Sequence, residues 1–278
     1  MTSNKDSNSK LETRNSKLIS SRDNSLLRQA RAVRDGKVED LIYVEGLRLS
    51  EEALRSHLTI EAVIYSDEIG RKERAAALIS ELEDSCERIG VVSESLLATV
   101  SYTKTPQGMI VLAQRPQSGT RLKPSVGRAE LIVILNGINN PVNVGAILRS
   151  AEGAGATAVI ATANSADPFS PKALRGAMGS AFRLPIWSGP SYSEALEWCV
   201  EHDIKTVCAD VEASKLYTDI DWTVPRALIV GPESTGLSSE EVAMAGEATR
   251  IPMHGNIESL NVGVAAAILL YEAARQRG

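Results

Sequence analysis

The feature of this sequence that most constrains its fold is a strand-to-helix unit near the middle of the chain. Residues 131–135, LIVIL, form a short apolar run bounded by Asn-Gly, which is typical of a strand buried on both faces. Pro141 then stops further sheet pairing. The apolar residues after it recur at helical spacing, namely Val144, Ile147, Leu148 and Ala151. The pattern predicts a helix that is capped by Asn143 and ended by Gly153 and Gly155.

Strands and helices alternate through the rest of the C-terminal half. Further apolar strand candidates lie at residues 157–161, 206–209 and 227–230. Ser170-Pro171 and Ser193 offer helix starts, and Ser238 with Glu241 has the S-x-x-E spacing of a capping box. Such alternation argues for a parallel sheet that is covered on both faces, so the sequence predicts an α/β domain.

Two polar segments lie where strands of this sheet end. Asn143 and Arg149 follow the first strand, and the ligand crevice of an open α/β sheet lies at the carboxyl ends of its strands. Residues 231–236, GPESTG, have the G-x-x-x-x-G spacing of a phosphate-binding loop. Leu237, however, stands where that loop needs a lysine, and Glu233 would repel a polyphosphate. The loop therefore suits a neutral or cationic ligand.

A third polar segment precedes the last helix of the chain. Ser259 and Asn261 stand at the entrance of an alanine-rich apolar helix, and either could cap it. One cap does not account for both side chains. The residues expected on one stripe of this helix are Val264, Ala267, Ile268 and Tyr271.

Together these segments resemble the SpoU/TrmH-type RNA 2′-O-ribose methyltransferases of the SPOUT superfamily. The three motifs of that family appear in order as NPVNVGAILRSAEGAGA, IVGPESTGLS and IPMHGNIESLNVGVAAAI, and RGAMGSAFRLPIW is similar to an intermediate stretch. The resemblance covers roughly residues 130 to 275. Near the N-terminus, SRDNSLLRQARAVRDGK and YVEGLRLSEEAL resemble the smaller RNA-binding domain that many members carry.

The resemblance implies a trefoil-knotted C-terminal domain whose second and third motifs gather around S-adenosylmethionine. It also implies a homodimer whose active site draws on both subunits. The catalytic residues that it implies are Arg149, Asn143, Glu233, Ser259 and Asn261. The cofactor contacts that we predict, largely through backbone groups, are Gly231, Ile251, Leu260, Met253 and Ala209.

The chemistry of the implied reaction limits the role of Arg149. Methyl transfer from a sulfonium needs an oxygen nucleophile held in line and requires neither a protein nucleophile nor a metal. A guanidinium stays protonated in proteins. We therefore expect Arg149 to clamp a neighbouring phosphate and to stabilise negative charge at the 2′-oxygen, instead of acting as a base.

The resemblance favours ribosomal RNA as the substrate. Two alternatives on the same fold are a transfer RNA 2′-O-methyltransferase and a non-catalytic RNA-binding or ribosome-assembly protein. A nicotinamide-dependent oxidoreductase is a third, suggested by Gly153-Ala154-Gly155. That G-x-G lacks a third glycine and opens no helix, so it does not fit the dinucleotide fingerprint.

Charge is distributed unevenly along the chain. Residues 1–37 hold nine Lys or Arg and four Asp or Glu, whereas the whole chain has a formal net charge of −5. A basic segment on an acidic body confines phosphate contacts to one side. From Ser21 onward, apolar residues alternate with arginines at helical spacing, which predicts an exposed basic face. The RNA-binding residues that we predict are Arg22, Arg28, Arg31, Arg34 and Arg48.

These patterns divide the chain into four parts. Residues 1–20 are expected to be a disordered basic tail, 21–115 an α/β RNA-binding domain, 116–128 a linker and 129–278 the methyltransferase domain. In the second part, strands are expected at 42–44, 62–65, 90–92 and 108–113, and helices at 50–57 and 71–88.

The sequence also predicts where the protein works. It has neither a membrane-spanning apolar run nor a signal-peptide core, which favours a cytoplasmic protein. The three cysteines lack C-x-x-C spacing and the three histidines are scattered, so no metal is expected.

Overall fold

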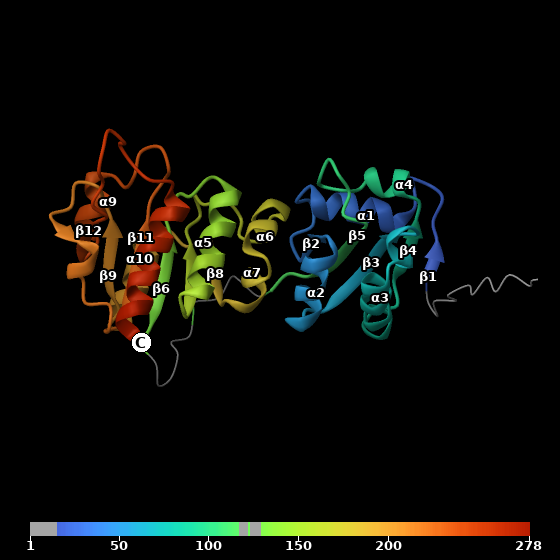
Figure 1. Cartoon of the computed structure of the whole chain (residues 1–278), viewed down its shortest axis with the longest axis horizontal. Helices are drawn as coiled ribbons and strands as arrows, with labels where there is room; N and C mark the ends of the chain where they lie inside the picture. The colour runs from blue at the N-terminus through green and yellow to red at the C-terminus, as the bar shows by residue number, and fades with distance from the viewer. Residues whose placement is uncertain (1–15, 117–121, 123–128) are drawn as a thin grey trace, which may run out of the picture.

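The computed structural model describes residues 16–116, 122 and 129–278, which form two α/β domains side by side (Figure 1). The N-terminal domain is built on a five-stranded sheet in the order β1-β4-β3-β5-β2. Its strands are β1 (Ser16–Leu18), β2 (Leu41–Glu45), β3 (Ile60–Ser66), β4 (Ile89–Val92) and β5 (Met109–Gln114). Its α-helices are α1 (Ser25–Arg34), α2 (Leu47–Arg55), α3 (Glu73–Ser85) and α4 (Glu94–Ala98).

The expected boundary between the tail and the N-terminal domain is wrong. Ser16 pairs in register with Ile89, and Ile19 is buried, so the domain begins before residue 21; residues 1–15 of the expected tail lie outside the described residues. The helix expected at 71–88 is confirmed with narrower bounds as α3, which a short 3₁₀ turn at Ile69–Arg71 precedes. Helix α4 was not expected. Most of the expected linker also lies outside the described residues.

The C-terminal domain has a seven-stranded parallel sheet in the order β10-β12-β9-β11-β6-β7-β8. Its strands are β6 (Leu131–Leu135), β7 (Ala158–Ala161), β8 (Ile186–Ser188), β9 (Lys205–Ala209), β10 (Lys215–Leu216), β11 (Arg226–Val230) and β12 (Glu247–Arg250). The four strands expected from apolar runs are confirmed as β6, β7, β9 and β11. The predicted α/β architecture with a smaller N-terminal domain is likewise confirmed.

The helices of the C-terminal domain are α5 (Pro141–Gly153), α6 (Pro171–Ala177), α7 (Ser180–Arg183), α8 (Tyr192–Glu201), α9 (Ser239–Met244) and α10 (Val262–Arg277). Ser238 and Glu241 form the expected capping box of α9. Ser191, not Ser193, caps α8. Helices α5 and α6 touch through Gly145, where an added Cβ would lie 2.3 Å from the carbonyl oxygen of Ala173.

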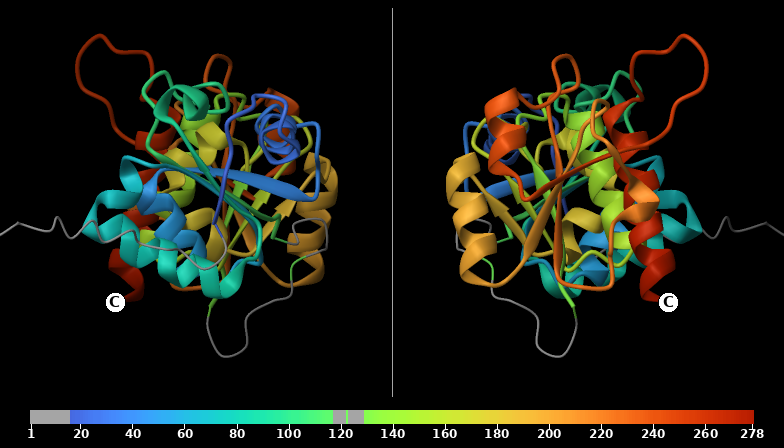
Figure 2. Two further views of the ribbon diagram at one scale, coloured as in Figure 1. Left: turned by 90° about the vertical axis from the view of Figure 1, so that its right-hand side faces the viewer. Right: turned by 90° about the vertical axis from the view of Figure 1, so that its left-hand side faces the viewer.

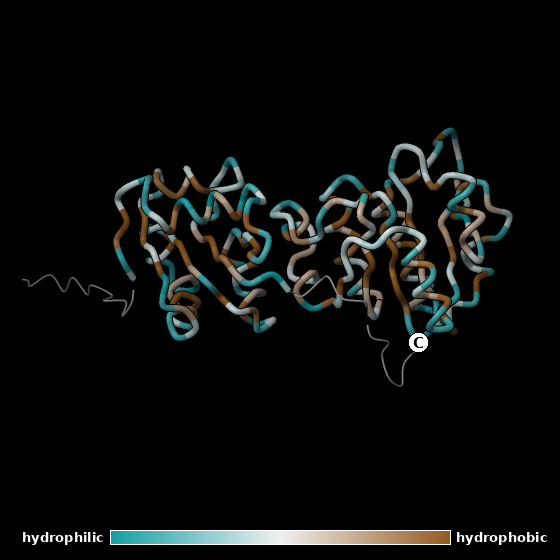
Figure 3. The backbone as a smooth tube through the Cα atoms, turned by 180° about the vertical axis from the view of Figure 1, so that it is seen from behind, coloured by the Kyte–Doolittle hydropathy of each residue, from teal (hydrophilic) through white to brown (hydrophobic). Residues whose placement is uncertain are grey.

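The last helix buries a different face from the one expected. Val264 and Tyr271 are 50% and 56% exposed, whereas the buried face carries Ala266, Leu269 and Leu270. Because this helix is apolar almost all round, its sequence periodicity does not select the face that packs. The apolar strands line the interior of both domains (Figure 3).

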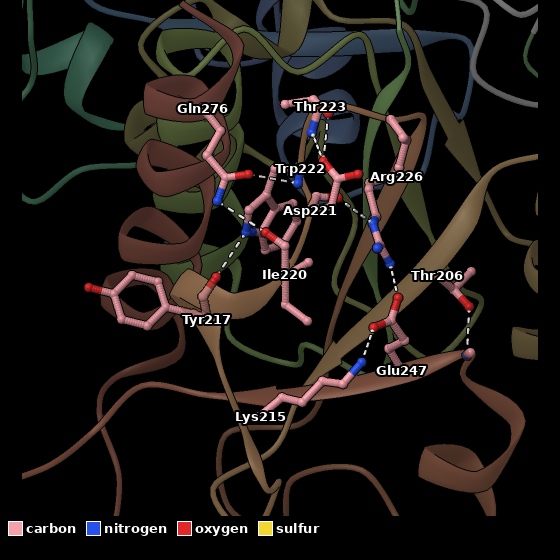
Figure 4. A network of polar contacts seen from close by, with 12 residues as sticks. Thr206, Lys215, Tyr217, Ile220, Asp221, Trp222, Thr223, Arg226, Glu247 and Gln276 are labelled. Carbon is pink, nitrogen blue, oxygen red and sulfur yellow. Dashed lines mark hydrogen bonds and ion pairs between the residues drawn. The ribbon is translucent and has the colours of Figure 1, made fainter.

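A polar network closes the amino-terminal edge of the C-terminal sheet (Figure 4). Arg226 is buried and pairs with Glu247, which also accepts from Lys215. The backbone nitrogen of Trp222 donates to the side chain of Gln276 on α10. These bonds neutralise the buried Arg226 and hold together the amino-terminal ends of the strands, opposite the carboxyl ends.

Charged side chains join the two domains. Arg183 pairs with Glu52 of α2 and with Glu152 of α5. Arg115, just after β5, pairs with Asp167 at 2.6 Å, and its guanidinium lies 4.7 Å from the ring centre of Phe169. No helix within the described residues is long and apolar enough to span a bilayer.

Candidate active site

A cavity of about 330 Å³ lies at the carboxyl ends of β9, β11 and β12. Its walls are the loop after β11, residues 231–237, and the segment between β12 and α10, residues 251–260. All five predicted cofactor contacts line it: Ala209, Gly231, Ile251, Met253 and Leu260. Its volume is within the range of small-molecule sites, roughly 300–1,000 Å³.

The loop after β11 is a tight turn whose shape depends on its first residue. A Cβ at Gly231 would lie 2.8 Å from the backbone nitrogen of Leu237, so another residue there would force the turn apart. Leu237 thus fills the turn from inside, at the position where a phosphate-binding loop carries lysine. The cavity wall offers apolar and backbone groups, as a neutral or cationic ligand requires.

Asn143 does not cap helix α5 as the sequence predicted. The cap is Asn140, whose side chain accepts from the backbone nitrogen of Val142 at 3.0 Å. Asn143 is buried one turn further along, where its Nδ2 donates to Oε1 of Glu233 at 2.9 Å. Its Oδ1 accepts from Nδ2 of Asn261 at 3.2 Å. One side chain from each of the three motifs therefore meets in a single chain of hydrogen bonds, which we call the motif link.

The start of α10 resolves the choice between two possible caps. Oδ1 of Asn261 accepts from the backbone nitrogens of Gly263 at 2.9 Å and Val264 at 3.4 Å, so Asn261 is the cap. Ser259 is exposed and lines the cavity. Its hydroxyl is therefore placed to contact a ligand.

Glu233 is ionised and oriented at the rim of the cavity. Burial raises the pKa of Glu233, but hydrogen bonds from the Asn143 side chain and from backbone N–H groups outweigh it and hold the pKa below its usual value. One of these bonds comes from the backbone nitrogen of Asn140 at 3.4 Å. The carboxylate therefore ties the second motif to the start of α5.

Glu233 and Ser259 line the cavity, and Asn143 and Asn261 are joined to it through the hydrogen bond to Glu233. Arg149 neither lines the cavity nor belongs to this link. It is exposed on α5, and its side chain has no hydrogen-bond or ion-pair partner within the described part of the chain. It lies two helical turns after the exposed Val142, on the same face of the helix. Helix α10 packs beside α5 and exposes Val264 and Tyr271. An unpaired cation thus lies on a helix pair with an exposed apolar surface.

Residues 130–271, half of the chain, match the SpoU rRNA Methylase family. The chain belongs to this family. The order and spacing of the three motifs predicted that assignment, which is confirmed. Residues 26–111 match an MRM3-like substrate binding domain, so both domains of this SpoU methylase have counterparts.

Relatives of this SpoU methylase match it over most of their length. The 23S rRNA (guanosine(2553)-2′-O)-methyltransferase RlmP of Bacillus subtilis is 30% identical over 82% of this chain and 86% of its own. A crystal structure of an RNA 2′-O ribose methyltransferase is 34% identical with a TM-score of 0.79, covering 94% of this chain and 99% of the other. The AdoMet-bound rRNA methyltransferase from Sinorhizobium meliloti is 28% identical with a TM-score of 0.81, covering 94% and 98%.

The predicted RNA-binding arginines of this SpoU methylase divide into free and engaged side chains. Arg22, Arg28 and Arg48 are exposed. Arg31 donates to the backbone oxygen of Arg22 at 2.7 Å. Arg34 pairs with a neighbouring aspartate and also holds a backbone oxygen of the loop before β5. The apolar side of α1 is buried, as predicted, but of its three arginines only Arg28 is exposed, while Arg31 and Arg34 are half-buried.

Sequence reasoning missed several polar residues of the site. Asp210, Arg250 and Glu258 also line the cavity. Asn136, directly after β6, is buried and donates to Glu241 at 2.7 Å, tying a strand end to the capping box of α9. For Asn136 and Asp210 the available signal was position, because polar residues immediately after a buried strand lie where ligands bind. No group of three or more acidic, cysteine or histidine side chains suited to a metal is found among the residues described.

Proposed function

We propose that this SpoU methylase transfers a methyl group from S-adenosylmethionine to a ribose 2′-hydroxyl of ribosomal RNA. The observation that carries the proposal is the motif link, Glu233–Asn143–Asn261, at the rim of a cavity lined by every predicted cofactor contact. The link lies at the carboxyl ends of the strands, which is where open α/β sheets bind their ligands.

The cavity fits S-adenosylmethionine by its chemistry. Three carboxylates, from Asp210, Glu233 and Glu258, line it together with one cation, Arg250, which favours a positively charged ligand. Apolar side chains and the backbone of the 231–237 loop supply the remaining wall. Bound there, the cofactor supplies an electrophilic methyl group on its sulfonium.

The chain itself orients the acceptor. The exposed hydroxyl of Ser259 contacts the ribose at the cavity, while the motif link holds the two loops that form the walls. Arg149 clamps the adjacent phosphate and stabilises the charge that develops on the 2′-oxygen, since its five donors suit bidentate contact with phosphate. The proton of the 2′-hydroxyl leaves to solvent as the oxygen attacks.

The protein acts as a homodimer in this proposal. The exposed apolar side chains Val142, Val264 and Tyr271 lie on the helix pair that carries Arg149. A symmetric contact through this surface buries them against their copies. Arg149 of one protomer then completes the cavity of its partner.

We further propose that the C-terminal domain is knotted, as its family resemblance implied. Strand β12 lies beyond β9, yet α10 packs on α5 and β11. Residues 251–261 therefore travel back past the 231–237 loop, with which they share the cavity, and Figure 1 shows them arching over the carboxyl ends of the strands. Threading of this segment through that loop accounts for the path.

Ribosomal RNA is the proposed substrate because several relatives that span both domains are named as 23S rRNA methyltransferases. RlmP of Bacillus subtilis is named for 23S rRNA, and it covers 82% of this chain. We also propose that the reaction takes place in the cytoplasm.

Labelled methyl transfer tests the proposal. Purified protein is incubated with tritiated S-adenosylmethionine and with rRNA or tRNA from cells that lack this protein. We expect tritium in rRNA, within dinucleotides that resist alkali because the 2′-oxygen is methylated. Label in base methyl groups, or in tRNA alone, would contradict the proposed substrate. Mapping 2′-O-methyl sites in cells with and without the protein then identifies the nucleotide.

A further inference from the structure

One aromatic side chain of the N-terminal domain is exposed without a structural reason. Tyr102 is 43% exposed, and Leu18 is the only other exposed large apolar side chain among the described residues of this domain. Tyr102 belongs to residues 101–107, here called the Tyr102 loop, between α4 and β5. This loop lies at the carboxyl ends of β2 and β3, because Gly46 and Ser66 donate backbone hydrogen bonds to Met109 and Gly108.

A buried carboxylate holds the Tyr102 loop from below. Glu45, at the end of β2, is only 6% exposed. Its oxygens accept from the backbone nitrogens of Tyr102 at 3.0 Å and Thr103 at 3.2 Å, and from the hydroxyl of Thr103 at 2.9 Å. Burying a carboxylate is costly unless donors satisfy it. Here every one of those donors comes from the loop, so Glu45 fixes the loop conformation.

Further contacts brace both ends of the loop. The hydroxyl of Tyr43 donates to the backbone oxygen of Val100 at 2.7 Å, and Arg34 donates to that of Ser101 at 3.4 Å. At the other end, Gly108 has a φ of +80°, and a Cβ there would lie 2.8 Å from that of Ile69. The loop is thus ordered before any ligand arrives.

We infer that the Tyr102 loop is a preformed platform on which the ring of Tyr102 stacks against an unpaired base of the RNA substrate. Proteins commonly recognise single-stranded RNA by stacking splayed bases on aromatic rings beside basic groups. Lys104 is exposed in the same loop, and Arg34 joins it to the basic helix α1. Glu45 is a positioning residue, since it acts only through the loop.

The placement of the loop supports an RNA that reaches both domains. The loop between α4 and β5 and the 251–261 segment rise from the same edge of the molecule in both Figure 1 and Figure 2. A single strand lying along this edge can contact the platform and the cavity together. The inference rests on the proposed function in one respect, that the ligand is RNA.

Binding of a short fluorescent oligouridine, compared with an RNA duplex of the same length, tests the platform. Tyr102→Ala should weaken single-strand binding about tenfold, because base–aromatic stacking is lost. Tyr102→Phe should retain affinity, since it keeps the ring. Leu18→Ala, which removes another exposed apolar side chain on β1, is the matched control and should change nothing. Equal affinity for Tyr102→Ala and the wild type would overturn the inference, as would an equal loss of duplex binding.

A double-mutant comparison tests the positioning role of Glu45. Glu45→Gln should weaken oligouridine binding several-fold when Tyr102 is present and hardly at all in the Tyr102→Ala background. Equal losses in both backgrounds would show that Glu45 acts on folding alone. Methyl transfer is measured separately on the same proteins. Ring-dependent RNA binding without transfer would sink the proposed function and leave the platform standing, whereas transfer without ring-dependent binding would do the reverse.

Discussion

Asn143 and Arg149 lie on one helix, α5, and belong to one sequence motif, yet the structure treats them in opposite ways. Asn143 is buried and joins Glu233 to Asn261 within a single chain. Arg149 is exposed and meets no partner within the described residues. The polar side chain at the start of α5 therefore has all its partners within one chain. The arginine on the exposed face of α5 needs a partner from another molecule, either RNA or a second subunit.

This difference in burial predicts which of the two residues contributes to the stability of the fold and which contributes only to the reaction. A buried amide whose partners are removed leaves donors and acceptors unsatisfied, so Asn143 contributes to folding as well as to the site. An exposed arginine contributes little to stability. Substitutions at Arg149 should consequently act on the reaction with little effect on the fold, and substitutions at Asn143 should act on both.

The largest expected effect is that of Arg149→Ala on methyl transfer. The rate should fall by on the order of 10²–10³, as when one charge-stabilising donor is removed from an active site. Affinity for S-adenosylmethionine, measured by calorimetry, should remain within about tenfold because Arg149 does not line the cavity. Arg149→Lys keeps the charge without the two-pronged donor, so it should recover part of the rate. Full turnover by Arg149→Ala would show that Arg149 has no part in the reaction, and would contradict the contrast drawn with Asn143.

Mixing two inactive variants tests whether Arg149 of one subunit acts in the cavity of the other. Gly231→Val deforms the cofactor cavity, because a Cβ there meets the backbone of Leu237. If Arg149 acts in its partner's cavity, a mixed dimer of Gly231→Val and Arg149→Ala has one intact site. Re-equilibrated mixtures should then regain about a quarter of the wild-type rate.

The mixing experiment has two controls. Each variant alone should stay inactive after the same treatment, and sedimentation should show dimers throughout. No recovery in mixtures that contain mixed dimers would place Arg149 with its own cavity. Tyr271→Asp, introduced alone, places a charge in the exposed apolar surface and should shift the protein toward monomers. The rate of methyl transfer should fall in proportion to the loss of dimers.

The same contrast explains how much the sequence could predict. Strands such as Leu131–Leu135 are continuous apolar runs buried on both faces, so their composition specifies them. The short β10 and β12 carry charged residues such as Lys215 and Glu247, which pair with each other across 32 residues, so no local pattern marks these strands. Packing, not periodicity, also decides which face of the alanine-rich α10 is buried.

The sequence predicted which residues form the site better than it predicted what each of them does locally. Asn140 and Asn143 are equally good caps by composition, and only the exit of the chain from β6 decides between them. The partners of Asn143 lie 90 and 118 residues away, beyond the reach of any local rule. That the cavity contacts act largely through their backbone, and that Arg149 acts across subunits, stay predictions.

A smaller effect is expected from breaking the motif link. Asn143→Ala should lower the free energy of unfolding by ~1–3 kcal/mol, because Nδ2 of Asn261 loses its acceptor and Oε1 of Glu233 loses its shortest hydrogen bond. Asn140→Ala on the same helix removes only the cap and should cost about 1 kcal/mol. Urea unfolding measures both. Cofactor affinity provides the contrast, since Asn143→Ala should weaken it while Asn140→Ala should not. Equal effects on affinity would mean that the link serves the helix alone.

The smallest expected effect is a pH dependence of stability that traces to Glu233. Burial raises the pKa of Glu233, but hydrogen bonds from Asn143 and from backbone N–H groups hold it below the ordinary value of 4.5. A carboxylate whose pKa is lowered by folding stabilises the protein fully above its unfolded pKa, and this contribution is lost as the pH falls through the folded pKa. The free-energy difference between the wild type and Glu233→Gln should therefore be constant near neutrality and shrink below pH 4.5. In the Asn143→Ala background the shrinkage should be weaker, because the strongest of those donors is gone. A difference that grows on acidification would mean that desolvation of Glu233 outweighs the link.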